Sequence, residues 1–171
     1  SGCDATLKRM NRKYDTARYL ESVELLNRWF DRPAVTTDLI TGFPEETEEE
    51  FAQTLDFIRK CRFAQMHIFP YSIRPGTPAA KMEQVPKAVK EERARRAAAV
   101  AEELRAAWLE RYRADCLTLG RTVRLLRAGE EEEAFAEAVD DAFALVVRRA
   151  DGSREAVSSG EVSVRGLLGY V

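Results

Sequence analysis

The feature that most constrains the fold is a capped helical segment between two short apolar runs, all within residues 34–71. Residues 34–40 are rich in β-branched side chains and end at a turn that contains glycine and proline, as a strand does. Thr47 and Glu50 have the spacing of a capping box, so a helix is expected to begin there. Residues 62–71 form a second run, apolar enough to be a strand covered on both faces. This order predicts a βαβ unit with parallel strands.

Two further helices are expected, one before this unit and one after it. Apolar side chains recur at helical spacing over residues 17–30, at Tyr19, Val23, Leu26 and Phe30. They predict an amphipathic helix, which Pro33 ends. Residues 86–115 contain no glycine and, after Pro86, no proline, and they are rich in alanine, glutamate, arginine and leucine. We therefore expect one long helix there.

Beyond Gly120 the pattern changes to short β-runs. These runs cover residues 123–126, 134–139, 144–147, 154–157 and 162–167. Asp151-Gly152 is a two-residue hairpin signal, with both residues expected at positive φ. The four carboxylates of residues 130–133 are interpreted as a hydrated turn. The predicted fold class is thus α/β, a partial parallel (β/α) barrel and a connecting helix, followed by a small all-β SH3-like or OB-like barrel.

Composition agrees with a folded chain made of two regions. All six lysines lie within the first 90 residues, and every later cation is arginine. A hydrophobic content of 45% and a net charge of −2 exclude a disordered chain, and no apolar run is long enough to cross a membrane. We predict a barrel segment over residues 1–85, a connecting helix over 86–115 and the small barrel over 116–171.

The cysteines bear on the cellular compartment. Cys3, Cys61 and Cys116 are odd in number and widely spaced, so neither a disulfide framework nor a cysteine metal site is indicated. The start of the chain lacks the layout of a signal peptide. A reducing, cytoplasmic location is expected, with no membrane partner.

Several motifs in the first region occur in a characteristic order. They are Ser-Gly-Cys-Asp at 1–4, Thr-Leu-Lys-Arg-Met-Asn-Arg-Lys-Tyr at 6–14, Thr-Thr-Asp-Leu-Ile-Thr-Gly-Phe-Pro at 36–44, Phe-Pro-Tyr-Ser at 69–72 and Gly-Thr at 76–77. Together they resemble the radical S-adenosylmethionine methylthiotransferases, most closely the branch that methylthiolates threonylcarbamoyl-adenosine in tRNA. The resemblance covers residues 1–105. It implies the C-terminal part of a (β/α) barrel whose strand ends line a cofactor pocket.

The same resemblance shows what this chain lacks. Intact members insert sulfur and a methyl group into a tRNA adenosine, using S-adenosylmethionine and a [4Fe–4S] cluster held by a Cys-x-x-x-Cys-x-x-Cys loop. That loop lies upstream of the segment present here, and the three cysteines have the wrong spacing to replace it. We therefore predict no catalytic residue, no metal ligand and no bound cofactor on this chain. The chain is interpreted as a fragment, inactive alone, whose partner is the missing N-terminal part.

The resemblance implies cofactor contacts at seven residues, namely Gly42, Phe43, Pro44, Phe69, Tyr71, Ser1 and Arg12. Gly42 would let a ligand approach the backbone, and Arg12 carries a fork that suits a carboxylate. The family usually has glycine at the position of Glu45. Without the resemblance, Gly42 and Pro44 indicate only a turn.

A basic cluster near the start of the chain suggests tRNA as a weakly bound partner. The predicted nucleic-acid contacts are Lys8, Arg9 and Lys13, with Arg12 and Arg18 nearby in the sequence. A merely solvated charged face is the alternative. His67, alone in an apolar run, is expected to be packed or hydrogen-bonded rather than catalytic.

The second region resembles a different family. Residues 112–123, 151–153, 158–166 and 169–171 resemble the C-terminal SH3-like domain of bacterial biotin–protein ligases, in the place where methylthiotransferases have a TRAM domain. The ligase's catalytic motifs are absent. Three hypotheses follow: a C-terminal piece of a methylthiotransferase-like enzyme with a diverged or replaced accessory barrel, an accessory module of a biotin–protein ligase, or a fusion of the two. The first is preferred because its match is longer and denser.

Two parallel strands alone rarely bury enough surface to be stable. Their unpaired edges tend to recruit another strand. We therefore expect self-association through the free edge of the first strand or through the bared helix faces.

Overall fold

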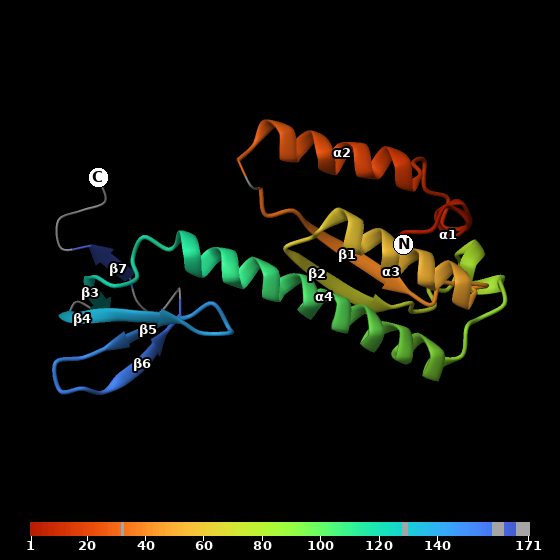
Figure 1. Ribbon diagram of the computed structural model, residues 1–171. Coiled ribbons are helices and arrows are strands. Elements are labelled where there is room, and N and C mark those ends of the chain that lie inside the picture. Colours follow the sequence, from red (N-terminus) through yellow and green to blue (C-terminus); the bar gives the residue numbers. More distant parts are fainter. Residues whose placement is uncertain (32, 128–129, 159–162, 167–171) are drawn as a thin grey trace. The chain divides into compact units, whose positions relative to one another are not determined.

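The computed structural model describes residues 1–31, 33–127, 130–158 and 163–166, and the chain forms two compact units (Figure 1). The first unit is Ser1–Ala106 and the second is Ala107–Val171. The long helix α4 (Lys87–Asp115) contributes residues to both. No helix of the described residues is long and apolar enough to cross a membrane.

The first unit is a mixed α/β structure. In chain order it contains α1 (Asp4–Arg9), α2 (Thr16–Trp29), β1 (Thr36–Thr41), α3 (Glu48–Cys61), β2 (Gln65–Pro70) and the 3-10 helix η1 (Pro78–Lys81), followed by the first part of α4. β1 and β2 pair in parallel, as the βαβ prediction requires. The sequence offers no prediction of α1, because a helix of six residues is too short to show apolar periodicity.

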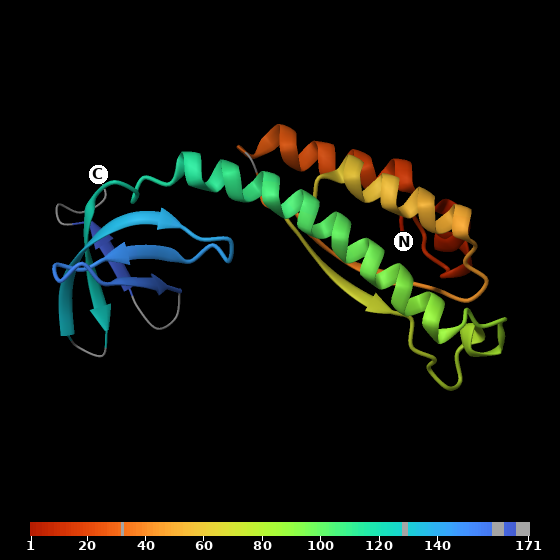
Figure 2. The same ribbon diagram turned by 60° about the horizontal axis from the view of Figure 1, so that its bottom comes forward.

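Three helices pack on the same face of the β1–β2 sheet (Figure 2). The core between them joins Val23 of α2, Phe51 of α3 and Val100 of α4 to Leu39 of β1. Along β2, half-buried residues alternate with exposed ones, so the opposite face of the sheet is open. The prediction of a strand covered on both faces is therefore wrong for β2. His67 lies on the open face and is exposed, so of the two predicted alternatives, packed or hydrogen-bonded, the packed one is wrong.

The predicted start of α3 is confirmed in atomic detail. The Thr47 hydroxyl accepts a hydrogen bond from the Glu50 amide at 3.2 Å, and the Glu50 carboxylate accepts one from the Thr47 amide at 3.1 Å. The helix ends at Cys61, and the C-cap residue Arg62 adopts the left-handed conformation at φ 52°. Because Arg62 caps the helix, β2 begins at Gln65 and not at residue 62.

The second unit contains a five-stranded antiparallel sheet. Its strands are β3 (Thr122–Arg127), β4 (Glu130–Val139), β5 (Leu145–Arg148), β6 (Arg154–Val157) and β7 (Ser163–Gly166), in the spatial order β6-β5-β4-β3-β7. Among the described residues β6 and β7 do not pair, so the sheet is not seen to close into a barrel. The predicted strand residues Val162 and Leu167, and residues 159–162 and 169–171 of the second resemblance, lie outside the described residues.

Two local predictions in this unit are wrong. Residues 130–133 lie in β4 rather than in a turn, where Glu131 pairs with Arg124 at 3.3 Å and Glu132 with Arg149 at 2.8 Å. Ion pairs with arginines outside β4 thus reduce the repulsion among these carboxylates and allow the run to form a strand.

In the β5–β6 hairpin only Gly152 has positive φ, at 84°, whereas Asp151 does not. The Gly152 amide bonds the Arg149 carbonyl at 3.0 Å, and the Arg149 amide bonds the Ser153 carbonyl at 2.9 Å. The loop between the paired residues 149 and 153 therefore has three residues, 150–152, and needs one left-handed position rather than two.

Candidate functional site

The carboxyl ends of β1 and β2 meet at one edge of the sheet. Parallel register aligns Thr41 with Pro70, and the Tyr71 amide donates to the Thr41 carbonyl at 2.8 Å. The rings of Phe43 and Tyr71 then lie edge to face, with centroids 5.1 Å apart. The structure thus brings together predicted cofactor residues from two separate segments of the chain.

These residues differ in how accessible they are. Phe43 and Pro44 are buried, whereas Phe69 is 52% exposed. Phe69 aligns with Ile40 across the two strands, and both lie on the open face opposite the helices. An aromatic ring beside an aliphatic side chain on an open strand end offers an apolar surface on which a purine can stack.

Gly42 has φ +67°, a conformation that favours glycine. The expectation was that its missing Cβ admits a ligand. Instead, a Cβ built at Gly42 would lie 2.5 Å from Cγ of Lys90, so the side chain of α4 makes the close approach there. A ligand would have to meet this turn from another side.

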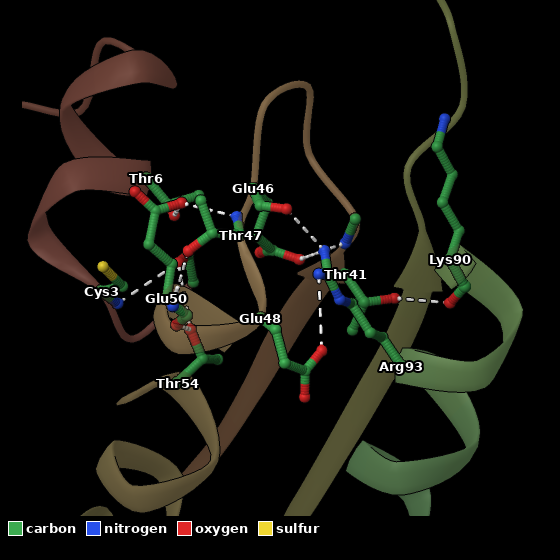
Figure 3. A network of polar contacts seen from close by, with 12 residues as sticks. Cys3, Thr6, Thr41, Glu46, Thr47, Glu48, Glu50, Thr54, Lys90 and Arg93 are labelled. Carbon is green, nitrogen blue, oxygen red and sulfur yellow. Dashed lines mark hydrogen bonds and ion pairs between the residues drawn. The ribbon is translucent and has the colours of Figure 1, made fainter. Parts of the chain in front are cut away.

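A buried ion pair holds the turn that follows β1 (Figure 3). Glu46 Oε2 accepts hydrogen bonds from the Gly42 amide at 2.8 Å and from Arg93 Nη1 at 3.0 Å. Arg93 Nη1 also donates to the Glu46 carbonyl at 2.8 Å. The side chains of Arg93 and Glu46 are only 5% and 1% exposed.

Burial is the largest influence on the Glu46 carboxyl. It raises the pKa of Glu46, and the Gly42 amide and the Arg93 charge only partly counteract that rise. Oε1 of Glu46 and Nε of Arg93 are buried and have no hydrogen-bond partner. Burying the pair therefore costs solvation free energy. The hydrogen bonds of Glu46 with the Gly42 amide and with Arg93 offset part of that cost.

Lys90, one helical turn before Arg93, contacts both strand ends. Its Nζ donates to the Tyr71 carbonyl at 3.3 Å and lies 4.9 Å from the centroid of the Tyr71 ring. Its own carbonyl accepts a hydrogen bond from the Thr41 hydroxyl at 3.4 Å. The sequence analysis does not identify Lys90, Arg93 or Glu46. For Lys90 and Arg93 the only signal was that two charged residues occupy helix positions expected to face the core. Glu46 precedes α3 and gave no such signal.

Ser1 and Arg12 lie on either side of α1 in the sequence, and Ser1 contacts α3. The Ser1 hydroxyl is 3.4 Å from the Thr54 hydroxyl and accepts a hydrogen bond from the Cys3 amide at 3.3 Å. Burial is the main cause of the lowered pKa of the Ser1 amino group; among the nearby charges Glu46 raises this pKa, and Arg12, a smaller influence, lowers it. Ser1 therefore lies within electrostatic range of Glu46 in the turn after β1 and of Arg12, which is exposed.

A cavity of about 60 Å³ adjoins Ser1. Its lining includes Tyr14, Tyr19 and Asp38. Ser1 is the only predicted cofactor residue in that lining. The cavity therefore does not connect Ser1 with the strand ends into one site.

The basic residues divide into two groups. Lys8 and Lys13 are exposed, and Lys13 donates to the Asn11 side chain at 2.8 Å. Arg9 instead forms a two-point ion pair with Glu50, and this hydrogen bonding is the main cause of the lowered pKa of Glu50. Arg9, predicted to contact nucleic acid, is thus engaged in joining α1 to α3.

The cysteines do not form a cluster site. Cys3 and Cys61 are buried in the first unit, where burial raises the pKa of Cys61 to about 11, and Cys116 belongs to the second unit. Within the described residues no three histidine, cysteine, aspartate or glutamate side chains are grouped to hold a metal. The residues present do not fit a [4Fe–4S] cluster, which needs thiolate ligands.

Comparison with known families assigns each region separately. Residues 1–58 match the radical SAM superfamily, and residues 118–165 match the biotin protein ligase C-terminal domain. Both resemblances are confirmed. Radical SAM enzymes use S-adenosylmethionine and a [4Fe–4S] cluster, so these are the cofactors of the intact family.

Curated relatives are tRNA-modifying enzymes. A tRNA-2-methylthio-N(6)-dimethylallyladenosine synthase from Streptomyces coelicolor is 48% identical over 132 residues, covering 77% of this chain and 25% of the relative. A threonylcarbamoyladenosine tRNA methylthiotransferase from Bacillus subtilis is 39% identical over 149 residues, covering 86% of this chain and 33% of the relative. The chain thus spans about a quarter to a third of the length of these relatives.

The length of these matches bears on the second unit. A match covering 86% of the chain cannot end within Ser1–Ala106, so it continues into Ala107–Val171. The second unit is therefore similar both to a methylthiotransferase and to a biotin protein ligase domain. A biotin protein ligase from Aquifex aeolicus has a TM-score of 0.33 at 13% identity, covering 57% of this chain and 50% of the ligase, too low a score to support an argument.

Proposed function

We propose that this chain is the C-terminal part of a methylthiotransferase-like radical enzyme that modifies tRNA. In this proposal residues 1–85 are the end of a (β/α) barrel, residues 86–115 connect, and residues 116–171 form an SH3-like barrel in the place of a TRAM domain. The contact between the β1 and β2 ends, with Tyr71 bonded to the Thr41 carbonyl, is the observation that carries it. In a parallel barrel, ligands bind at the carboxyl ends of strands.

The chain's own residues would hold the adenosyl part of S-adenosylmethionine. Phe69 and Ile40 supply an apolar face beside the turn at residues 42–44 and the end of β2. Bound together with the cluster, S-adenosylmethionine supplies the methyl group and the radical chemistry of the reaction. The cluster ligands would come from the part of the protein that precedes this segment in relatives, so the chain alone is proposed to be inactive.

A chimera tests this proposal. This chain would replace the matching C-terminal segment of the Bacillus subtilis relative, and the product would be reconstituted anaerobically with iron and sulfide. We expect cleavage of S-adenosylmethionine to 5′-deoxyadenosine, and a loss of about tenfold or more in Phe69→Ala, since stacking on an aromatic ring contributes about 1–3 kcal/mol. A folded chimera with an intact cluster but no cleavage would contradict the proposal.

Contact with tRNA is proposed at Lys8 and Lys13, the exposed members of the basic cluster. Replacing both by glutamate in the same chimera should weaken tRNA binding and reduce its salt dependence by about two phosphate contacts. The matched control replaces Lys60 and Lys87, which are also exposed lysines of the first unit. If the two double variants weakened tRNA binding equally, the proposed contact of tRNA with Lys8 and Lys13 would be wrong.

A second candidate applies to the second unit alone. Its match to the biotin protein ligase C-terminal domain supports an accessory role in a ligase. The unit would be fused to a ligase core from which the C-terminal domain has been removed. Restored biotin transfer to an acceptor protein would support this candidate, and no restoration would eliminate it.

Self-association is proposed for the isolated chain. In the described residues β1 and β2 pair only with each other, and the first unit exposes Trp29 at 76% and Phe30 at 59%. Such surface favours association. Light scattering of the wild type should give a mass above 19.4 kDa, and Trp29→Glu with Phe30→Glu should lower it. A monomeric wild type would contradict this.

A further inference from the structure

The buried stripe of α4 changes character along its length. Lys90, Arg93, Ala97 and Val100 are all buried at spacings of three and four residues, so they lie on one face of the helix. Ala97 and Val100 pack in the apolar core. Lys90 and Arg93 continue the same stripe with charged side chains, although lysine is rarely buried without a specific partner.

The partners of these two charges are the two strand ends. Arg93 reaches the turn after β1 through Glu46, and Glu46 in turn accepts the Gly42 amide (Figure 3). Lys90 spans both segments, because its stem occupies the space over Gly42 while its Nζ meets the Tyr71 carbonyl and ring. One side chain therefore contacts both segments to which the cofactor pocket is assigned.

We propose that Lys90 is a positioning residue of the candidate cofactor pocket. It fixes the separation between the Gly42 turn and Tyr71, so that the two segments that border the proposed adenosyl site keep one arrangement. Arg93 supports it by holding the same turn through Glu46. This inference rests on the proposed function, because the pocket it positions is the one proposed there.

The contact of Lys90 with both segments can be tested without measuring activity and without a ligand. Lys90→Met keeps an unbranched stem over Gly42 but removes the ammonium group, and Lys87→Met is the matched control on the same helix, at a lysine that is 89% exposed. Loss of one partly buried hydrogen bond and a cation–π contact should speed hydrogen exchange at the Tyr71 and Gly42 amides about tenfold. Exchange within α3 should stay unchanged. Equal exchange rates in the two variants would overturn the inference.

The pocket is tested with 5′-deoxyadenosine as the probe, followed by amide chemical shifts in the full chain. In the wild type we expect shifts at Gly42, Phe43 and Tyr71. The dissociation constant should rise about fivefold to tenfold in Lys90→Met and stay at the wild-type value in Lys87→Met. Lys90→Arg, which retains a cation near the Tyr71 ring, should bind within about twofold of the wild type.

The two ways of failing are distinguishable. If 5′-deoxyadenosine shifts none of these amides in the wild type, the proposed pocket is wrong, and with it the positioning role. If the wild type binds with these shifts but Lys90→Met binds equally tightly, the pocket stands and the role of Lys90 is wrong. A melting temperature of Lys90→Met close to that of Lys87→Met shows that the comparison is made between folded proteins.

Discussion

Both units contain exposed ion pairs, but among the described residues only the first contains a pair whose two side chains are almost completely buried. In the first unit, Arg93 and Glu46 form an ion pair whose side chains are 5% and 1% exposed. In the second unit, Arg154 and Glu137 form one at 2.6 Å whose side chains are 64% and 30% exposed. Water screens the second pair and not the first, so similar contacts differ greatly in what their loss costs.

Position in the fold explains the difference. The buried pair joins α4 to the turn after β1, two segments 47 residues apart in sequence, at the edge where the candidate pocket lies. The exposed pair joins β6 to β4, which lie on either side of β5 in a sheet whose core is already apolar on one face. A buried ion pair can hold a loop beside a binding site in one conformation. The strands of a small sheet are already held by their backbone hydrogen bonds, so their charged side chains can remain in water.

The largest expected effect concerns metal binding. Reconstituted anaerobically with iron and sulfide, the chain should acquire no stable [4Fe–4S] cluster, because two of its three thiols are buried and the three lack the spacing of a cluster loop. Iron analysis and the visible spectrum are the measurements. Stoichiometric iron with the broad absorbance of such a cluster would show that the cysteines can meet.

The next effect concerns the buried pair. Arg93→Met leaves the Glu46 carboxylate buried without its cation, which should reduce the free energy of unfolding of the first unit by about 3–5 kcal/mol. Hydrogen exchange by mass spectrometry can follow the two units separately. Arg154→Met is the matched control and should have a much smaller effect, since that pair is exposed. Equal losses would contradict the contrast between the units.

The same variant has a predicted pH dependence. Burial already raises the pKa of Glu46 in the folded state, and removing Arg93 removes a charge that lowers it. A raised folded pKa means that the folded protein binds the proton more tightly than the unfolded chain, so stability is lost as pH rises through that pKa. The loss in Arg93→Met should therefore shrink as pH falls from neutral through the raised pKa of Glu46. A loss independent of pH would exclude a Glu46 origin.

Glycine-to-alanine substitutions in the two units should differ in their effect on the free energy of unfolding, by less than the two arginine substitutions do. Gly42 and Gly152 both have positive φ, at 67° and 84°. Alanine at Gly152 meets no atom within 4 Å and should cost about 1–2 kcal/mol for its backbone conformation alone. Alanine at Gly42 would also meet Cγ of Lys90 at 2.5 Å, adding about 1–3 kcal/mol of overpacking. Combining Gly42→Ala with Lys90→Ala should recover part of that addition, and no recovery would contradict the contact.

Periodicity and capping chemistry were sufficient to predict most of the elements. Thr47 and Glu50 marked the start of α3, and the apolar spacing around Val23 marked α2, because these signals are local. The exposure of His67 was not predictable, since it depends on what covers the second face of the sheet. Residues 130–133 were misjudged because their neutralising arginines come from β3 and from the residue after β5.

The candidate site was predicted only in part for the same reason. The turn at Gly42 and the end of β2 at Tyr71 were identified from sequence motifs, and the structure brings them together. Lys90, Arg93 and Glu46 were missed because a charged residue at a core-facing position does not reveal its partner. Arg9 was assigned to nucleic acid, while its distant partner Glu50 could be found only in three dimensions.

The smallest expected effect concerns Glu137, which lies where the pairing of β4 and β5 shifts register. Its carboxylate contacts Arg154 at 2.6 Å and Arg148 at 3.6 Å, and the hydrogen bond from Arg154 is the main cause of its lowered pKa. A lowered folded pKa gives stability above the unfolded pKa, and this stability is lost as pH falls through the folded one. Glu137→Gln should therefore unfold slightly more easily than the wild type at neutral pH and equally easily in acid.

Salt provides the decisive measurement for this variant. The pair is exposed, so raising the sodium chloride concentration to about 1 M shortens the screening length to roughly 3 Å and should remove the difference from the wild type. The difference between Arg93→Met and the wild type should persist at the same salt concentration, because water and ions do not reach that pair. If salt abolished both differences, the Glu46–Arg93 pair would be solvated in solution, and the distinction between the two units would fail.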